Sequence, residues 1–341
     1  MELMSVTMKD IAAVANVSIG TVDRALHNRG RIAPEVQERI LFIAKQMNYQ
    51  KNMTASSLSI SDKHYKIAVV LHVHQNDFYK DILKGITRAK KEISDFGIKV
   101  EIYYCNDFDA EAQLQLIDTA IANGASAMAI VPIDHPRISQ KLAQLHEEHF
   151  PVLFLSSILR NTPCVSAVRC NYANSGFIAA GLVRILARDI TKVLVFTPSL
   201  SMMAHRYRVE GLKTALAENS PEITLTEIVE LPNDSFDSYR ITSEKLAQHT
   251  DVNFVIYCGS ARAGLKAIQD CTRTIHSVFY DYADETKAAL KERKIDAVIL
   301  QNPQKQGYLA ITTLSNHLIS KEMPVPLIEV ENIILIPESI L

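Results

Sequence analysis

Apolar and polar positions follow two different patterns along this chain of 341 residues. Up to residue 49, apolar side chains recur every three to four positions in three short stretches, which predicts three short helices. From residue 66 onward, short runs of mainly branched apolar residues alternate with longer stretches of helical spacing. Strands and helices that alternate in this way are typical of parallel sheets with helices on both faces. The pattern therefore predicts an all-α head followed by an α/β core.

The core pattern assigns most residues to a strand or a helix. The predicted strands are 66–71, 99–104, 126–131, 151–155, 192–197, 253–258, 276–280 and 295–300. The predicted helices are 78–96, 109–122, 136–148, 173–188, 204–218, 237–248, 261–270, 283–292 and 304–319. Because a region of this size is large for a single sheet, two doubly wound parallel-sheet lobes are the better interpretation.

A polar stretch rich in small residues separates the head from the core. We therefore expect a head over residues 1–50, a hinge or linker over 51–65 and a core over 66–341. Within the core, the expected lobes are about 66–167 with 301–319, and about 168–300 with 320–341.

The head has residues that suit the ends of short helices. Thr7 and Ser18 precede the first and second predicted helices, where a hydroxyl can cap backbone N–H groups. Asn16 lies between them, where a tight turn needs the left-handed backbone that Asn tolerates. The spacing predicts that the following side chains face inward: Met8, Ile11, Val14, Ala15, Val22, Ala25, Leu26, Val36, Ile40, Ile43 and Met47.

The second predicted helix has a polar face opposite its apolar stripe. A short helix with such a face, held across a tight turn by another helix, is the shape that enters a DNA major groove. The candidate DNA-contacting residues of this helix-turn-helix head are Thr7, Ser18, Ile19, Gly20, Thr21, Asp23, Arg24, His27, Arg29 and Arg31. On the pattern alone, an ordinary three-helix bundle with a solvated surface is an equally good interpretation.

The stretch from Met8 to Asn28 is more specific than a helix pattern. It contains Ile-Ala, then Ala-x-Val-Ser-x-x-Thr-Val-x-Arg-x-Leu-x-Asn, and Asn48-Tyr49 follows at the end of the third predicted helix. This signature resembles that of the lactose-repressor (LacI/GalR) family of bacterial regulators. The resemblance implies a homodimer that binds a pseudo-palindromic double-stranded DNA operator, and it favours DNA binding over the plain bundle.

The resemblance also gives the linker a function. In this family the linker forms a hinge helix on DNA, and a leucine wedges into the minor groove; the matching residues are Leu58 and, one turn earlier, Ala55. The alternative is that Leu58 packs on the core. Asp23 stands where the family usually has serine, and Lys51 where it usually has proline. These departures concern the operator sequence and the ordering of the hinge, not DNA binding itself.

The core resembles the family's effector domain, which is similar to type I periplasmic sugar-binding proteins. Such folds bind ligands between two lobes, at the carboxyl ends of the strands. Polar and aromatic residues follow successive predicted strands here, and aromatic faces beside hydrogen-bonding groups suit a carbohydrate. The candidate ligand-binding residues are His74, Asn76, Phe78, Tyr79, Ser156, Arg206, Arg208, Ser260, Asp281 and Gln301. The resemblance implies a sugar or sugar derivative as the effector.

The sugar-binding pattern is incomplete. Ser156-Ser157 stands where the pentose binders have Asp-Arg, and Cys258-Gly259-Ser260 replaces an Asn-Asp pair. Phe78 and Tyr79 are also explained as core residues in the first turn of a helix. Each polar candidate is likewise explained as a satisfied strand end or helix cap.

Composition and charge narrow the class of protein. Apolar residues make up 48% and charged residues 22%, which is typical of a soluble globular protein. Five scattered cysteines fit reduced thiols better than disulfides or a zinc site. The first residues lack a signal-peptide pattern, and no apolar run is long enough to span a bilayer. We therefore expect a cytoplasmic protein that associates with the nucleoid when bound to DNA, and no membrane partner.

The sequence lacks the motifs of the common enzyme classes on this fold. There is no glycine-rich dinucleotide loop, no P-loop, no G-x-S-x-G and no H-E-x-x-H. His72 and His74 are interpreted as polar lining rather than a metal site. We therefore expect a regulator, in the form of a repressor, without catalytic residues, cofactor or metal. The alternative interpretations are a sugar-binding protein without a regulatory role and an enzyme.

Overall fold

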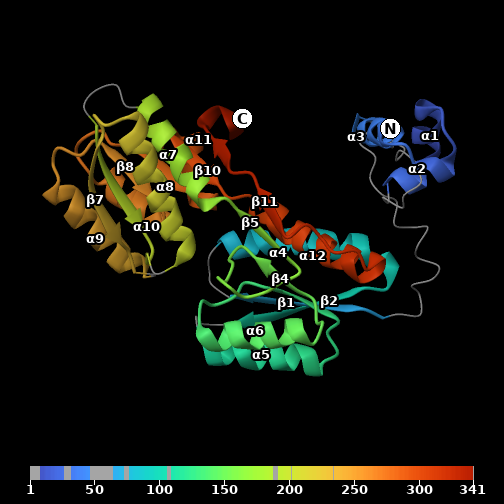
Figure 1. Ribbon diagram of the computed structural model, residues 1–341. Coiled ribbons are helices and arrows are strands. Elements are labelled where there is room, and N and C mark those ends of the chain that lie inside the picture. Colours follow the sequence, from blue (N-terminus) through green and yellow to red (C-terminus); the bar gives the residue numbers. More distant parts are fainter. Residues whose placement is uncertain are drawn as a thin grey trace. The chain divides into compact units, whose positions relative to one another are not determined.

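A computed structural model describes residues 8–26, 32–46, 64–72, 77–105, 109–186, 191–200, 202–232 and 234–340. The chain divides into two compact units, Met1–Asp62 and Lys63–Leu341. The first corresponds to the head and the second to the core (Figure 1).

The head contains the three predicted helices, α1 (Met8–Ala15), α2 (Ile19–Leu26) and α3 (Pro34–Gln46). Asn16 has a φ of 51°, so the turn between α1 and α2 uses the left-handed backbone as predicted. The Ser18 hydroxyl accepts a hydrogen bond from the Thr21 backbone N–H at 3.1 Å, which confirms the predicted cap of α2. The buried residues of the head are Ile11, Ala12, Ala15, Val22, Ala25, Ile40 and Ala44.

One predicted core residue of the head is wrong. Val14 is 59% exposed, whereas Ala12 is buried. Each residue turns the helix by about 100°, so Ile11, Ala12 and Ala15 share one face of α1 and Val14 lies outside it. Spacing alone allowed either choice, and the packing of α1 on α2 and α3 decided it.

The first lobe of the core is a six-stranded parallel sheet with strand order β11-β5-β4-β3-β1-β2. Its strands are β1 (Lys66–His72), β2 (Lys99–Cys105), β3 (Ala127–Ile130), β4 (Val152–Leu155), β5 (Ser166–Cys170) and β11 (Leu327–Val330). Its helices are α4 (Asp77–Ile93), α5 (Ala110–Ala122), α6 (Pro136–Glu147) and α12 (Pro303–Ser320), with a 3-10 turn at Ser94–Phe96. α4 and α12 cover one face, and α5 and α6 the other (Figure 1).

The second lobe repeats this plan with the strand order β12-β10-β9-β8-β6-β7. Its strands are β6 (Lys192–Thr197), β7 (Thr224–Glu230), β8 (Phe254–Tyr257), β9 (His276–Tyr280), β10 (Ala297–Leu300) and β12 (Ile333–Leu335). Its helices are α7 (Tyr172–Leu186), α8 (Met203–Asn219), α9 (Ser235–Gln248), α10 (Ala261–Gln269) and α11 (Asp284–Lys291), and a 3-10 turn follows at Pro337–Ile340. Only β12 is antiparallel to its neighbour among the paired strands of the described residues.

The predicted fold class is confirmed: every predicted strand and helix of the core is present. The pattern missed β5, β7, β11 and β12. β7 carries mostly half-buried or exposed side chains, and β11 and β12 form sheet edges with few buried positions. Strands of this kind lack the apolar run that marks a central strand of a parallel sheet.

The chain crosses between the lobes three times, and this changes the expected lobe bounds. α7 follows β5 of the first sheet but packs on the second, whereas α12 follows β10 of the second sheet and packs on the first. The third crossing lies between β11 and β12. The first crossing therefore follows Cys170 rather than residue 167, and 327–330 belongs to the first lobe rather than the second.

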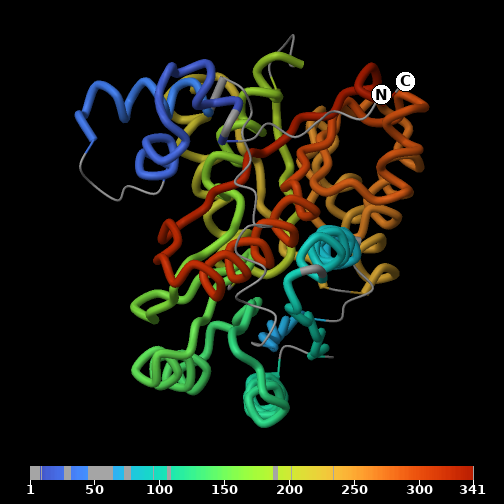
Figure 2. Tube along the Cα trace, turned by 90° about the vertical axis from the view of Figure 1, so that its right-hand side faces the viewer, coloured from blue at the N-terminus to red at the C-terminus, as the bar shows by residue number. Residues whose placement is uncertain are grey.

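The crossing segments lie side by side although they are far apart in sequence. Figure 2 shows the red C-terminal segment running beside the green segment that contains β5. The Asn332 side-chain amide donates to the backbone oxygen of Asn171 at 3.0 Å, and Asn171 donates to Glu329 at 3.2 Å. The hinge between the lobes is thus held by side-chain contacts between neighbouring crossings. No helix in the described part of the chain combines the length and apolar character needed to cross a membrane.

Candidate functional site

The exposed face of α2 carries the side chains that the sequence predicted for DNA contact. Ile19, Gly20 and Arg24 are exposed, and Thr21 and Asp23 are half-buried. The Ser18 and Thr21 hydroxyl oxygens lie 2.8 Å apart, and Arg24 Nη2 donates to Thr21 Oγ1 at 3.4 Å. The helix therefore presents a continuous row of polar groups. The remaining candidates of the head and hinge, Thr7, His27, Arg29, Arg31, Ala55 and Leu58, lie outside the described residues.

In the core, three strand ends have an unusual backbone. Ser156 after β4, Asp281 after β9 and Asn302 after β10 have φ values of 60°, 68° and 53°. Left-handed backbone is costly for most residues other than glycine, and such residues gather at functional sites. Ser156 and Asp281 are two of the predicted ligand-binding residues, so the strained positions coincide with the predicted site.

Arg208 of α8 is the most deeply buried cation of this region, with 4% of its surface exposed. Its Nη1 donates to Cys258 Sγ at 2.8 Å, and its Nε donates to Ser175 Oγ at 3.4 Å. The guanidinium carbon lies 3.9 Å from the centre of the Tyr280 ring. Arg208, Cys258 and Tyr280 line a small pocket together with apolar side chains of β6, β8 and α8.

Close packing of α7 on α8 places Ser175 beside Arg208. A Cβ added at Gly176 would lie 2.1 Å from the Arg208 carbonyl oxygen, and one at Gly211 would lie 2.2 Å from the Ala173 carbonyl oxygen. Only glycine permits this approach at both positions. Tyr280 then donates its hydroxyl to the Ser175 carbonyl at 2.9 Å, which fixes the ring against the guanidinium.

His205 lies one helical turn before Arg208. Its Nδ1 is 3.3 Å from Arg208 Nη1 and 3.7 Å from Cys258 Sγ. Burial, and then the charge of Arg208, lower the pKa of His205 to about 3. Because arginine is only a donor, Nδ1 must be the unprotonated acceptor of a neutral imidazole. Burial also raises the pKa of the Cys258 thiol to about 11, so Arg208 is surrounded by neutral groups.

A chain of hydrogen bonds joins the ends of β4, β9 and β10. Gln301 donates from Nε2 to Asp281 Oδ1 at 2.6 Å, and Gln306 donates to the Gln301 carbonyl at 2.8 Å. Ser156 in turn donates its hydroxyl to Gln306 Oε1 at 2.7 Å. The Tyr172 hydroxyl donates to the Ser156 carbonyl. The network connects both sheets at their carboxyl ends, where the predicted site lies.

Asp281 links this network to Arg208 electrostatically. Burial raises the pKa of Asp281, whereas Arg208 and the hydrogen bond from Gln301 lower it. No ion pair within 4.0 Å joins Asp281 to Arg208 among the described residues. The structure thus joins Asp281, Gln301 and Ser156 through hydrogen bonds, and Arg208 interacts electrostatically with Asp281.

Three other predicted ligand residues, Phe78, Tyr79 and Arg206, have different contacts in the structure. Phe78 and Tyr79 occupy the first turn of α4 and pack against the core of the first lobe, with their ring centres 5.4 Å apart. Burial raises the pKa of Tyr79, so its hydroxyl stays protonated. Arg206 donates to the Leu200 carbonyl at 3.4 Å. His74 and Asn76 lie outside the described residues.

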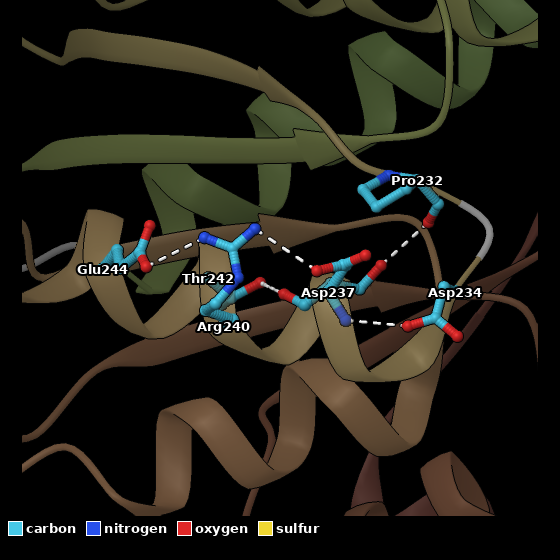
Figure 3. Close-up of polar contacts among 7 residues, drawn as sticks. Pro232, Asp234, Asp237, Arg240, Thr242 and Glu244 are labelled. Carbon is cyan, nitrogen blue, oxygen red and sulfur yellow. Dashed lines mark hydrogen bonds and ion pairs between the residues drawn. The ribbon is translucent and has the colours of Figure 1, made fainter.

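Ser260 belongs to the attachment of α9 rather than to the group around Arg208. Its hydroxyl oxygen lies 2.9 Å from that of Ser235, the first residue of α9. Figure 3 shows the polar contacts that fix this end: the Asp237 backbone N–H donates to Asp234 Oδ1 at 2.9 Å, and Ser238 donates to the Pro232 carbonyl at 2.8 Å. The contact between Ser260 and Ser235 agrees with the alternative interpretation of Ser260, in which its hydroxyl is satisfied at the end of a helix.

The sequence analysis did not include several residues that shape the site. His205 and Ser175 contact Arg208, and Tyr172 and Gln306 support Ser156. Helical spacing could have suggested His205, because it lies three residues before Arg208. Ser175 comes from a different helix, and no local pattern relates it to the site. Among the described residues, no group of three or more His, Cys, Asp or Glu side chains is arranged to hold a metal ion.

Comparisons with known proteins match both units. Residues 7–52 match the family described as bacterial regulatory proteins, lacI family. Residues 67–322, more than half of the chain, match the periplasmic binding protein domain. The first match covers the three helices of the head, and the second covers most of both lobes.

Similar proteins include regulators and sugar-binding proteins. Catabolite control protein A of Priestia megaterium is 25% identical over 268 residues, which cover 78% of this chain and 77% of that protein. The ribose import binding protein RbsB of Haemophilus influenzae is 23% identical over 279 residues, or 80% and 92% of the two chains. RbsB is similar to the core over nearly its whole length.

Solved structures show the same fold. A putative LacI transcriptional regulator from Bacteroides fragilis superimposes with a TM-score of 0.73 at 23% identity, over 82% of this chain and 99% of the other. A periplasmic ribose ABC transporter protein from Conexibacter woesei gives a TM-score of 0.72 at 21% identity, over 81% and 93%. The family matches, together with the residues of the head, decide the class of protein. The chain belongs to the lacI family of bacterial regulatory proteins, and is a DNA-binding transcriptional regulator, not an enzyme, with a periplasmic-binding-protein-like effector domain.

Proposed function

We propose that this regulator is a repressor whose affinity for its operator is controlled by a sugar or sugar derivative bound between the lobes of the core. The observation that carries the proposal is the buried group of Arg208, Asp281 and Gln301 at the carboxyl ends of the strands. Ligands of α/β sheets bind at this edge. Buried polar groups, one of which has a nitrogen, Arg208 Nη2, unpartnered among the described residues, are suited to hydroxyl or charged groups of a small ligand.

Ligand binding at this position can change DNA binding by the head through the three crossings that join the lobes. The lobes are joined by three crossings, and Arg160 of the first lobe donates to the hydroxyl of Tyr207 of the second at 2.6 Å. A ligand that bridges Arg208 and Asp281 stabilises one arrangement of the lobes over others. In a homodimer, a change of lobe arrangement alters the spacing of the two heads and therefore the fraction able to bind a pseudo-palindromic operator.

The head supports specific operator contacts. The exposed row on α2 offers hydroxyls to phosphates and Arg24 to a phosphate or a guanine edge. Gly20 has no side chain, so the backbone of α2 can approach base edges closely, and Ile19 can make an apolar contact there. Asp23, beside Arg24, suits a cytosine amino group. Binding to chromosomal DNA places the proposed site of action in the cytoplasm.

The proposal is tested by operator binding of the purified full-length protein. A library of fragments from the source genome is selected for binding, and the recovered site is measured by gel shift at several salt concentrations. We expect a pseudo-palindromic site and an affinity that falls steeply with salt, because phosphate contacts release counterions. Arg24→Ala should weaken binding roughly tenfold or more, since such a contact is worth about 1–3 kcal/mol.

The matched control is Arg262→Ala in the core, where the arginine is 80% exposed and paired with Glu285. This variant should bind the operator as the unaltered protein does. Selection of no common site, or equal losses for Arg24→Ala and Arg262→Ala, would contradict the proposed DNA contact.

A further inference from the structure

We infer that the effector is an anionic sugar derivative whose carboxylate or phosphate group pairs with Arg208. The inference rests on the proposed function and narrows the class of its effector. It starts from the surroundings of the guanidinium, which is buried between α7, α8 and the ends of β8 and β9.

The contacts of Arg208 are all with uncharged groups. Nη1 meets the Cys258 thiol and the neutral His205 imidazole, Nε meets the Ser175 hydroxyl, and the Tyr280 ring covers one face. Within the described part of the chain, no ion pair includes Arg208, whereas arginines at the surface, such as Arg262 and Arg293, are paired with carboxylates. A buried charge that lacks a partner in contact is strongly unfavourable. An arginine held in this state would be stabilised by an anion supplied from outside.

One nitrogen of the guanidinium lacks a protein partner in the described part of the chain, and such a ligand would supply one. Nη2 of Arg208 is buried and has no hydrogen-bond partner among the described residues. The contacts of Nη1 to His205 at 3.3 Å and of Nε to Ser175 at 3.4 Å are long, and these weak bonds can be exchanged. The planar guanidinium matches two oxygens of a carboxylate or phosphate, and this pairing is stronger than one with a sugar hydroxyl.

Asp281 determines where the anionic group can lie. Its carboxylate accepts from Gln301 at Oδ1 and would repel an anion placed beside it. A neutral sugar would satisfy Asp281 through its hydroxyls but would leave Arg208 without an anion in direct contact, since Asp281 acts on Arg208 without forming an ion pair. A ligand that carries its anionic group at one end and hydroxyls at the other satisfies both residues. Sugar acids and sugar phosphates share this chemistry.

The test compares matched pairs of ligands on the full-length protein by thermal unfolding and titration calorimetry. The pairs are galactose with galacturonate, glucose with gluconate, glucose with glucose 6-phosphate and ribose with ribose 5-phosphate, with inorganic phosphate as the background. We expect at least one charged member to bind tenfold or more tightly than its neutral partner. A preference confined to the sugar acids or to the sugar phosphates shows which of the two groups, carboxylate or phosphate, the effector carries.

Variants of the site assign the preference to Arg208. Arg208→Met should abolish the preference for the charged member, and Arg208→Lys should keep part of it, because lysine is a point charge without the bidentate edge. Asp281→Asn should weaken binding but retain the preference for charge. Arg262→Met, at an exposed position of α10 paired with Glu285, is the control and should bind as the unaltered protein does. If Arg208→Met does not fold, Arg208→Lys and Asp281→Asn still test whether Arg208 is the source of the preference for charge.

Two results would overturn the inference. In the first, neutral members bind as tightly as charged ones; in the second, no member of any pair binds. Retention of the charge preference in Arg208→Met would also contradict the assignment of Arg208. None of these results affects operator selection by the head, so a failed inference is distinguishable from a failed proposed function.

Discussion

The buried imidazole of His205 makes the stability of the core depend on pH. The perturbation is acidification from pH 7 to pH 5, compared between the unaltered protein and His205→Asn. Asparagine keeps an acceptor oxygen near the position of Nδ1, which faces Arg208 at 3.3 Å, but it does not titrate.

The sign and size of the change in the free energy of unfolding follow from the pKa values of His205 in the unfolded and folded chain. In the unfolded chain the pKa of His205 has its ordinary value of 6.5, whereas burial lowers it to about 3 in the folded protein. Between these values the unfolded chain binds the additional proton, so the free energy of unfolding falls as the pH falls. Each pH unit below 6.5 costs about 1.4 kcal/mol, and the step down to pH 5 costs about 2 kcal/mol. The His205→Asn variant should therefore lose about 2 kcal/mol less free energy of unfolding than the unaltered protein between pH 7 and pH 5.

The assay is urea unfolding followed by far-ultraviolet circular dichroism, because the chain contains no tryptophan for fluorescence. The free energies of unfolding at pH 7 and pH 5 are compared within each protein, so that a constant loss from the substitution cancels. His146→Asn, at an exposed position of α6, is the control and should lose as much as the unaltered protein. Equal losses for the unaltered protein and His205→Asn would refute a neutral, buried His205 beside Arg208.

Two further predictions concern how the second lobe is held together. Gly211→Ala places a methyl group 2.2 Å from the Ala173 carbonyl oxygen and should destabilise the protein by about 1–3 kcal/mol in chemical denaturation. Gly181→Ala, on α7 with open space around it, should instead be neutral or stabilise by up to about 1 kcal/mol, and the reverse order would contradict the close crossing of α7 and α8. Asp234→Ala removes the cap of α9 seen in Figure 3 and should cost about 1 kcal/mol, whereas Asp234→Asn should restore most of it. An unchanged unfolding midpoint for Asp234→Ala would show that this cap does not contribute.

The sequence by itself determined the elements and the class of protein. The helices of the head and the central strands of both sheets are encoded by spacings of two to four residues, which are local and therefore visible in one sequence. The turn at Asn16 and the cap at Ser18 were predicted for the same reason, since each depends on its near neighbours. The motif in the head was specific enough to indicate a regulator.

The order of the strands and the exchange of helices between the lobes were decided by tertiary structure. β11 pairs with β5, although most of the second lobe lies between them in sequence, and its exposed edge position left no apolar run to mark it. The expected lobe bounds failed at this point. Pairing between distant strands depends on which surfaces are left uncovered after the central strands have assembled, and local spacing does not record it.

The site combines both kinds of information. The sequence indicated Arg208, Asp281 and Gln301 through its resemblance to the ligand-binding segments of the family. Two uncharged hydrogen-bond partners of Arg208, Ser175 and Cys258, are 33 and 50 residues away from it in the sequence. Only the packing of α7 on α8 brings these neutral groups around the guanidinium and leaves it without a carboxylate in contact. The tertiary structure therefore decided the electrostatics of the site, because burial and distance set the energy of a charge and neither is a property of the local sequence.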